Sequence, residues 1–233
     1  MIPSASTRFI RASLAAVCIL FAQASGCRRI DNPTAPLDGA TVTTTLAGRV
    51  LDESGVGLPG VSVSTPGGSA TTDANGVFFI PNVSVTATRA CVIAKKAGYF
   101  NGARAAVPSR HGVTYFELAL ASNAAVGTID GVVGGTVSLP TGASLNLRSN
   151  GVVSSGGAAY TGSVSVSAKY LDPASPTFNN LFPGNLDAQD ASGNATELQT
   201  YGVLIAELHG SSGETLQPAS GKPATITIPI SPA

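Results

Sequence analysis

The stretch from Leu46 to Ile80 reads LAGRVLDESGVGLPGVSVSTPGGSATTDANGVFFI. In it, short runs of β-branched and aromatic residues are separated by clusters of Gly, Pro, Asn and Asp. Such runs favour β-strands, and such clusters favour tight turns. Between Val61 and Ser64, apolar and polar residues alternate with a period of two, which is typical of a strand with one buried and one solvated face. The stretch therefore predicts strands of a β-sandwich.

The composition of the whole chain agrees with this prediction. The chain has 233 residues, of which 43% are hydrophobic and 11% charged, with 27 glycines, 15 prolines and no tryptophan. The hydrophobic fraction is too high for intrinsic disorder, and the richness in turn-forming residues argues against a helical bundle. The formal net charge is zero, so no basic field is present to hold nucleic acid. We expect an all-β protein that does not bind nucleic acid.

Further candidate strands share this pattern of apolar runs bounded by turn residues. In the first half of the chain they are residues 46–51, 60–65, 77–80, 90–95 and 113–120. In the second half they are residues 135–139, 144–148, 163–170, 201–209 and 224–230. Residues 172–197 contain four carboxylates and three prolines and predict a long loop. The pattern predicts two β domains, at residues 45–121 and 122–233.

Four pieces of the first half occur in the order and spacing of a known family. They are GRVLD at 48–52, GLPGVSV at 57–63, TDANGVF at 72–78 and KAGY at 96–99. In these pieces the Leu-Pro-Gly turn presets the backbone, and Asp-Ala-Asn-Gly is a tight hairpin connection that needs a positive φ at Gly76. Together they closely resemble the carboxypeptidase regulatory-like domain. This resemblance implies a seven-stranded, prealbumin-like β-sandwich that serves as an accessory module of exported bacterial proteins and has no catalysis of its own.

The second half is similar to the β-rich segment that follows such domains in some bacterial surface proteins. In those proteins more chain follows a strand like residues 224–230, whereas this sequence stops at Ala233. We therefore predict a second sandwich-like β domain at 122–233, and leave open whether it is complete at its C-terminus.

The N-terminus has the layout of a bacterial signal peptide. Arg8 and Arg11 precede an apolar run at residues 12–22, which is too short to span a bilayer. The Ala-Ser-Gly-Cys stretch that ends at Cys27 resembles a lipobox, in which this cysteine receives diacylglycerol and becomes the mature N-terminus. The alternative is ordinary signal-peptidase cleavage, with Cys27 an incidental cysteine.

The lipobox predicts where the protein resides. Residues 1–26 would be a lipoprotein signal peptide, Cys27 the lipidation site and residues 27–44 a tether. The protein would then be exported and anchored by lipid in a membrane, at the outer membrane, its periplasmic face or the cell surface. Because Cys18 leaves with the signal peptide and Cys27 is lipidated, we also expect no intramolecular disulfide in the mature chain. Cys91 is expected to be a small buried residue of a strand.

The sequence offers little catalytic chemistry. His111 and His209 are its two histidines, and it contains no His-x-x-His, Cys-x-x-Cys, Gly-x-Ser-x-Gly or phosphate-binding loop. We therefore predict no catalytic residues, no cofactor and no metal site with nitrogen or sulfur ligands, and we expect that the protein is not an enzyme.

The carboxylates permit two interpretations. Asp52, Glu53 and Asp73 stand in predicted turns, where such groups usually cap backbone N–H groups. The predicted long loop offers oxygen ligands of the kind that Ca²⁺ prefers, so calcium binding there stays open. These carboxylates are Asp172, Asp187, Asp190 and Glu197.

Taken together, the sequence favours a membrane-tethered exported lipoprotein that acts as a structural or ligand-binding, adhesin-like module of the bacterial cell envelope. Its partner would be an envelope protein or a glycan. Two alternatives stay open, a carbohydrate-binding module and an accessory subunit of a hydrolase or transport system. Carbohydrate binding would use exposed aromatic rings. The candidates are Tyr99, Phe100, Tyr160, Phe178, Phe182 and Tyr201.

Overall fold

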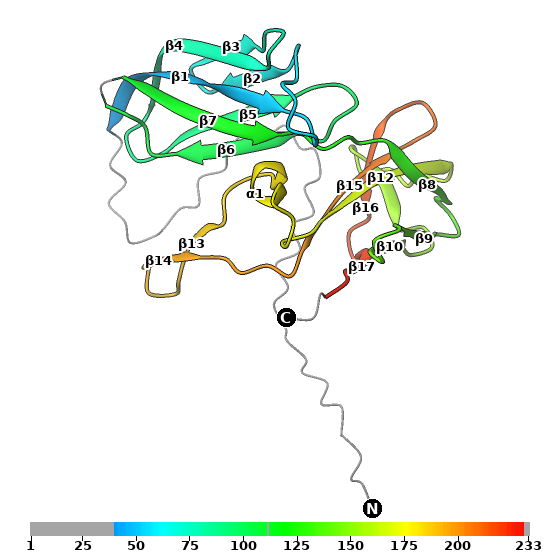
Figure 1. The fold of residues 1–233 in the computed structure, drawn as a ribbon. Helices are drawn as coiled ribbons and strands as arrows, with labels where there is room; N and C mark the ends of the chain where they lie inside the picture. Colours follow the sequence, from blue (N-terminus) through cyan, green and yellow to red (C-terminus); the bar gives the residue numbers. More distant parts are fainter. Residues whose placement is uncertain (1–39, 111, 231–233) are drawn as a thin grey trace, which may run out of the picture.

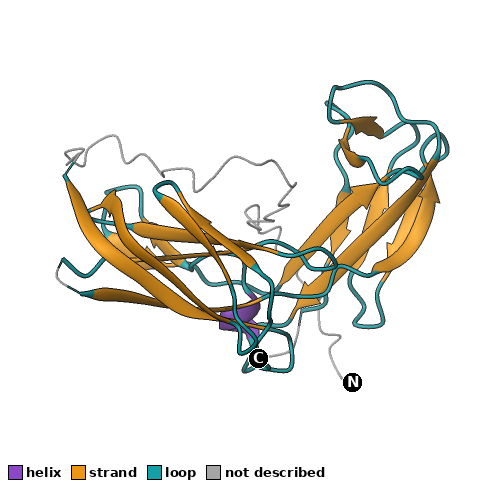
Figure 2. Ribbon diagram, turned by 90° about the horizontal axis from the view of Figure 1, so that it is seen from above, coloured by secondary structure: helices purple, strands orange, loops and turns teal. Residues whose placement is uncertain are grey.

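The computed structural model describes residues 40–110 and 112–230, in which it has seventeen β-strands and one short helix. All but two of these strands form two sandwiches that lie next to each other, and the other two form a separate hairpin (Figures 1 and 2). The predicted all-β fold class is therefore confirmed. The predicted signal peptide, the lipidation site Cys27 and His111 lie outside the described residues.

The first sandwich has seven strands in two sheets, the number that the family resemblance implies. The three-stranded sheet has the order β4-β1-β7, with β1 at Thr41–Leu51, β4 at Val77–Thr86 and β7 at Val113–Ala119. The four-stranded sheet has the order β3-β2-β5-β6 and comprises β2 (Ser62–Thr65), β3 (Gly68–Thr71), β5 (Ala90–Lys95) and β6 (Gly102–Ala106). The core between them includes Leu46, Val63, Phe78, Val92 and Phe116.

Two strands of this sandwich are longer than predicted. β1 begins at Thr41, so it includes the last residues of the range predicted as a tether. β4 continues past Pro81, although a proline normally ends a strand. It can do so because β4 is an edge strand of its sheet and because the register shifts opposite Thr45, where Asn82 has a φ of 52°.

The second sandwich also has two sheets. The larger one has the order β11-β16-β15-β12-β8 and comprises β8 (Ala125–Asp130), β11 (Val152–Ser154), β12 (Ser163–Leu171), β15 (Val203–His209) and β16 (Thr215–Pro218). The smaller one, β17-β10-β9, comprises β9 (Gly135–Ser138), β10 (Ser144–Leu147) and β17 (Thr225–Thr227). Apolar side chains from both sheets fill the space between them, including Leu145, Val164, Val166, Leu208 and Leu216.

Residues 172–202 leave the second sandwich between β12 and β15 and extend to the first one; we call them the docking segment (Figure 1). The predicted loop in this region is in part wrong, because the segment contains helix α1 (Phe178–Leu181) and a hairpin of β13 (Asp187–Gln189) and β14 (Ala195–Glu197). A third apolar core joins the segment to both sandwiches. Its buried residues are Leu51, Phe100, Ala119 and Ala121 from the first, Leu171, Val203 and Ile205 from the second, and Phe178 and Leu181 from the segment.

Two further features bear on the predictions. Cys91 lies in β5, as predicted, but it is half-buried and disulfide-bonded, so the expectation that the mature chain forms no disulfide is not supported. Across the described ranges, no helix is long and apolar enough to cross a membrane.

Candidate functional site

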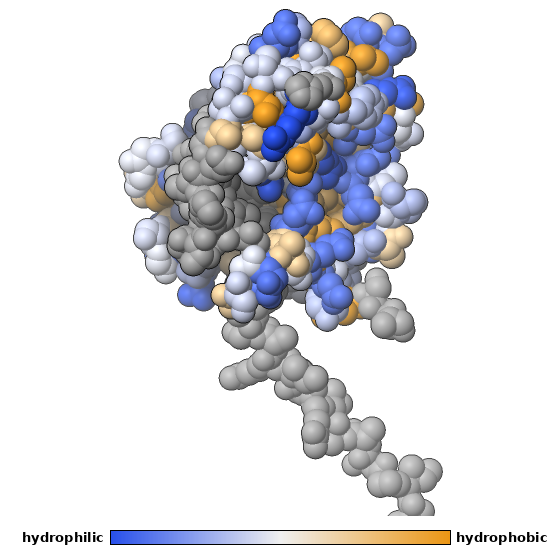
Figure 3. All heavy atoms as spheres, turned by 90° about the vertical axis from the view of Figure 1, so that its left-hand side faces the viewer, coloured by the Kyte–Doolittle hydropathy of each residue, from blue (hydrophilic) through white to orange (hydrophobic). Residues whose placement is uncertain are grey.

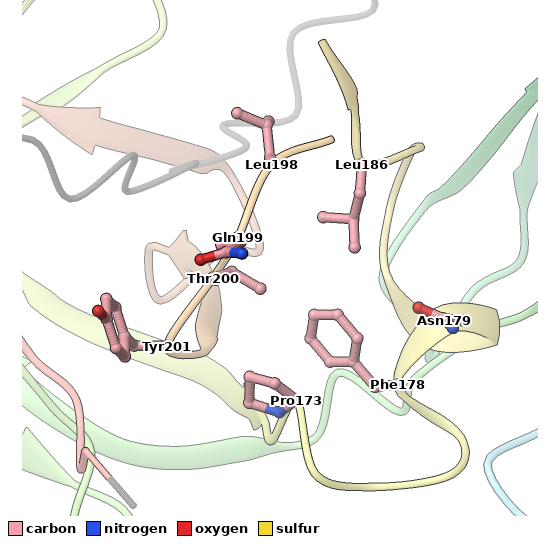
Figure 4. Close-up of a pocket in the computed structure, with 8 residues that line it drawn as sticks. All are labelled: Pro173, Phe178, Asn179, Leu186, Leu198, Gln199, Thr200 and Tyr201. Atoms are coloured by element: carbon pink, nitrogen blue, oxygen red, sulfur yellow. The ribbon is translucent and has the colours of Figure 1, made fainter. Parts of the chain in front are cut away.

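The docking segment borders a pocket of about 380 Å³ that is open to solvent on one side. The pocket lies between the outgoing arm of the segment, which follows β12 and contains α1, and its returning arm, which leads into β15. The residues that line it are Pro173, Phe178, Asn179 and Leu186 of the outgoing arm and Leu198, Gln199, Thr200 and Tyr201 of the returning arm. In Figure 4 the Phe178 ring and the Leu186 side chain point into the space between the two arms, and the Tyr201 ring lies at its edge.

The pocket has an aromatic floor and an exposed aromatic rim. Phe178 is 5% exposed and packs against Phe182, with 5.6 Å between the ring centroids. Tyr201 is 73% exposed. A buried ring is held in place by its contacts, whereas an exposed tyrosine offers an apolar face and a polar hydroxyl to a ligand.

The polar groups of the pocket are uncharged. Within the described part of the chain, no hydrogen bond holds the side-chain amides of Asn179 and Gln199. The Thr200 hydroxyl donates to Gly202 O at 3.0 Å and accepts from Gly202 N at 3.1 Å, so it shapes the turn. An aromatic surface beside two amides suits an uncharged ligand with both apolar faces and hydroxyl groups.

Arg104 of β6 fastens one arm of the pocket. Its guanidinium donates to three backbone carbonyls of the docking segment, those of Asn179, Asn180 and Gly184. Burial lowers the pKa of Arg104 by desolvation, but an arginine remains a cation in proteins. Backbone carbonyls at the end of a helix have no intrahelical partners, and the Arg104 guanidinium satisfies such carbonyls in and just after the single turn of α1.

Asn185 fastens the segment to the same strand. Its side chain accepts from Ala105 N at 3.0 Å and donates to Ala105 O at 2.9 Å. Because β6 is the edge strand of its sheet, these two bonds take the place of a neighbouring strand at this residue. The Asn180 amide adds a bond to Glu117 of β7 at 3.3 Å.

Glu53 connects the two sandwiches at another point. Its carboxylate accepts from Ser122 N at 2.7 Å and forms an ion pair with Lys169 of β12. Both side chains of the pair are about one-third exposed, so solvent limits its contribution to about 1 kcal/mol or less. Glu53 is thus an inter-sandwich contact, unlike the cap of its own turn that the sequence predicts.

Asp52 and Asp73 cap backbone N–H groups, as predicted. Asp52 Oδ1 accepts from Ser54 N at 2.8 Å and Val56 N at 2.9 Å. Asp73 Oδ1 accepts from Asn75 N at 2.9 Å and from the N–H two residues further at 2.8 Å.

The carboxylates of the docking segment are not gathered at one point in the part of the chain that the structure describes. Asp172 accepts from a backbone N–H at 2.9 Å, Asp187 from the Asn185 amide at 3.1 Å, and Asp190 from two backbone N–H groups and the amide of Asn194. Glu197 is exposed at the end of β14. In the residues that the structure describes, no three His, Cys, Asp or Glu side chains are placed to hold a metal ion.

His209 has a carboxylate neighbour that the sequence interpretation missed. Its Nε2 lies 3.5 Å from Glu207 Oε2, and this carboxylate also accepts from the Asn123 amide at 3.1 Å. Residues two apart on a strand share a face, so the spacing of Glu207 and His209 on a predicted strand already indicates that the two side chains are neighbours.

Most of the predicted aromatic candidates support the fold. Phe100 is buried in the third core, and Tyr99 packs against the first. The Tyr160 hydroxyl accepts from Ser211 N at 2.9 Å and donates to Ser163 O at 3.2 Å. Of the six candidates, only Phe178 and Tyr201 line the pocket.

Two exposed rings were missed by the sequence interpretation. Phe79 is 58% exposed and Tyr115 is 62% exposed, and both pair with Ala47 of the central strand β1. The alternation in β4 places Phe79 on the face opposite to buried Phe78, which was the available signal. On the side of the molecule in Figure 3, the apolar side chains form small groups between hydrophilic ones.

Comparisons with known proteins show no family for this chain. No protein family and no curated protein match it. Among solved structures, the Bacillus anthracis TIE protein is 12% identical with a TM-score of 0.30; the alignment covers 81% of this chain and 46% of that one.

Two further structures come from Bacteroides species. A Bacteroides fragilis protein of unknown function, provisionally described as membrane-associated, is 13% identical (TM-score 0.29; 80% and 97% covered). A Bacteroides uniformis protein, provisionally described as carbohydrate binding, is 12% identical (TM-score 0.28; 80% and 99% covered).

Proposed function

We propose that the protein is a membrane-tethered exported lipoprotein that acts as a ligand-binding module of the bacterial cell envelope. Its binding site is the pocket of the docking segment, and its first sandwich is a carboxypeptidase regulatory-like domain. The N-terminal layout supports the export and the anchor, and the four sequence pieces support the domain. The observation that carries the binding role is a pocket of about 380 Å³ with an aromatic floor and rim and two side-chain amides that no described residue hydrogen-bonds.

A neutral glycan is the ligand class that this pocket favours. No residue that lines it is charged, so it lacks the groups that would select an anion or a cation. The exposed Tyr201 ring can pack on the apolar face of a sugar, and the amides of Asn179 and Gln199 can bond to sugar hydroxyls. We propose no catalytic step, because no residue that lines the pocket can titrate near neutral pH.

The lipid anchor is tested by replacing Cys27. We expect Cys27→Ser to move the protein from the membrane fraction to the soluble fraction, and we expect two or more acyl chains on the N-terminal peptide of the parent by mass spectrometry. The same sample, digested without reductant, identifies the cysteine to which Cys91 is disulfide-bonded. Equal fractionation of parent and variant, with no acyl mass, contradicts the anchor.

The binding role is tested on a glycan array with the chain from residue 28 onward. We expect retention of a neutral glycan, and we expect Tyr201→Ala to weaken it at least tenfold, about 1.4 kcal/mol, because a few aromatic anchors that a ligand covers dominate binding energies. Tyr115→Ala is the matched control, since Tyr115 is similarly exposed but lies on the first sandwich. If only Tyr115→Ala weakens glycan binding, the binding site lies on the β4-β1-β7 sheet instead. If the parent retains no glycan, the glycan proposal is refuted.

A further inference from the structure

We infer that the first sandwich completes the pocket: Arg104 and Asn185 are positioning residues that hold the docking segment in its binding form, and a ligand in the pocket and the contact between the sandwiches stabilise each other. The inference rests on the proposed role of the pocket. Nothing in the sequence predicts it, because Arg104 and the carbonyls that it binds are 75 to 80 residues apart.

The docking segment buries little by itself. Of its side chains whose burial the structure describes, only Phe178 and Leu181 are buried. Its hairpin β13-β14 is a two-stranded sheet of its own, with an exposed second strand. Two-stranded hairpins are marginally stable in water, so the segment needs contacts from outside to keep one conformation.

Much of that anchorage comes from the first sandwich, although the segment is an insertion in the second. Phe178 and Leu181 share the third core with Leu51, Phe100 and other residues of the first sandwich. The hydrogen bonds from Arg104, Asn185 and Asn180 also join the segment to the first sandwich. Figure 1 shows α1 directly beneath β6 and β7.

The groups that anchor the segment also shape the pocket. Arg104 binds the backbone of Asn179, whose side chain lines the pocket, and Asn185 precedes the lining residue Leu186. When these bonds are lost, the arm that carries Phe178 and Leu186 can move away from the arm that carries Tyr201. Because only the docked form presents both arms, the apparent affinity falls in proportion to the docked fraction, and by linkage a ligand raises that fraction.

Hydrogen exchange on the full chain tests the inference without a ligand. The reporters are the hydrogen-bonded amides of Leu181, Phe182 and Leu198. We expect Arg104→Gln and Asn185→Ala each to speed their exchange at least tenfold, while amides of β5 and β12 keep the parent rate. Arg104→Lys should restore part of the protection, because one ammonium reaches fewer carbonyls than a guanidinium does.

The matched control is Arg49→Gln, because the Arg49 guanidinium also binds a backbone carbonyl, that of Asn75, within the first sandwich. It should leave the reporters unchanged. Unchanged reporters in both Arg104→Gln and Asn185→Ala would overturn the inference, as would equal acceleration across both sandwiches. If the parent retains no glycan on the array, the glycan proposal fails, and the exchange rates still decide whether the first sandwich positions the pocket.

Discussion

Gly76 shows how a single residue specifies a turn of the first sandwich. Its φ is +77°, as the Asp-Ala-Asn-Gly pattern predicts, and its N–H donates to Asp73 O at 3.0 Å. A Cβ at this position would lie 2.3 Å from Val50 O and 2.6 Å from Leu58 N. Gly55 has nearly the same φ, +78°, but a Cβ there would meet nothing within 4 Å.

Alanine variants of Gly55 and Gly76 separate the cost of backbone strain, which both would have, from the cost of a steric clash, which only Gly76→Ala would have. We expect Gly55→Ala to lower the free energy of unfolding by about 1–2 kcal/mol, the cost of a left-handed conformation for an L-residue. Gly76→Ala should cost about 1–3 kcal/mol more, because backbone must also move. Denaturant unfolding measures both, and equal costs would show that the crowding at Gly76 is unimportant.

Asp190 gives the docking segment a pH dependence. Hydrogen bonds from the side chain and backbone of Asn194, and from other backbone N–H groups of the turn, lower the pKa of Asp190. A lowered pKa in the folded state adds stability that is complete above the unfolded value, about 3.9, and that is lost as the pH falls through the folded value. We therefore expect the turn between β13 and β14 to lose this stabilising contribution in that acid range.

A carboxyl NMR titration checks this expectation. The midpoint of Asp190 should lie below that of an unstructured aspartate, and Asn194→Ala should raise it, because the largest contribution comes from the Asn194 side chain. A midpoint at the ordinary value in the parent would contradict the assigned bonds.

The sequence predicted single residues well only where their partners are local. The local turn pattern specifies the positive φ of Gly76, and Asp52 and Asp73 accept hydrogen bonds from residues at most four positions away. Glu53 depends on distant chain, because its partner Lys169 lies 116 residues away. Tyr201 is among the predicted aromatic candidates, but the pocket that it borders also needs Pro173 and Phe178 from another part of the docking segment. No local pattern contains that information.

Among the elements of the first sandwich, Thr72, which follows β3, binds the Leu-Pro-Gly turn that precedes β2. Its buried hydroxyl donates to Leu58 O at 2.7 Å and accepts from Val61 N at 2.9 Å. We expect Thr72→Val to lower the free energy of unfolding by about 1–3 kcal/mol, because the change leaves two buried backbone groups without this partner.

Thr72→Ser is the control, since it keeps the hydroxyl and loses only a methyl group. It should retain the melting temperature more closely than the valine variant does. If valine is as stable as the parent, the hydroxyl does not hold the turn, and the Leu-Pro-Gly corner keeps its shape by backbone conformation alone.

The predicted strands were mostly those that contribute to a core. The interior strands β5, β10 and β12 match their predicted ranges to within one residue at each end, because their alternation reflects burial. The predicted strands do not include β3, β6, β8, β11 or β16, of which all but β16 are edge strands. Of these, β3 and β6 are rich in Gly and Ala. Such strands carry weak β propensity and are held by their neighbours, which only the tertiary structure shows.

At the scale of the whole molecule, a third core makes the two sandwiches and the docking segment contiguous. The sequence predicted two domains and a loop, but it could not predict that the loop would cross to the first sandwich, because this contact depends on where β12 and β15 end in space. The pocket results from that crossing. Its walls belong to the docking segment, and many of the contacts that hold these walls come from the first sandwich.

Scanning calorimetry of the chain from residue 28 onward shows whether the two sandwiches and the docking segment unfold as one unit. We expect one unfolding transition at neutral pH, with equal calorimetric and van't Hoff enthalpies. Two separated transitions, each with the enthalpy of a single sandwich, would show instead that the third core and the bonds from Arg104 and Asn185 do not couple the two sandwiches.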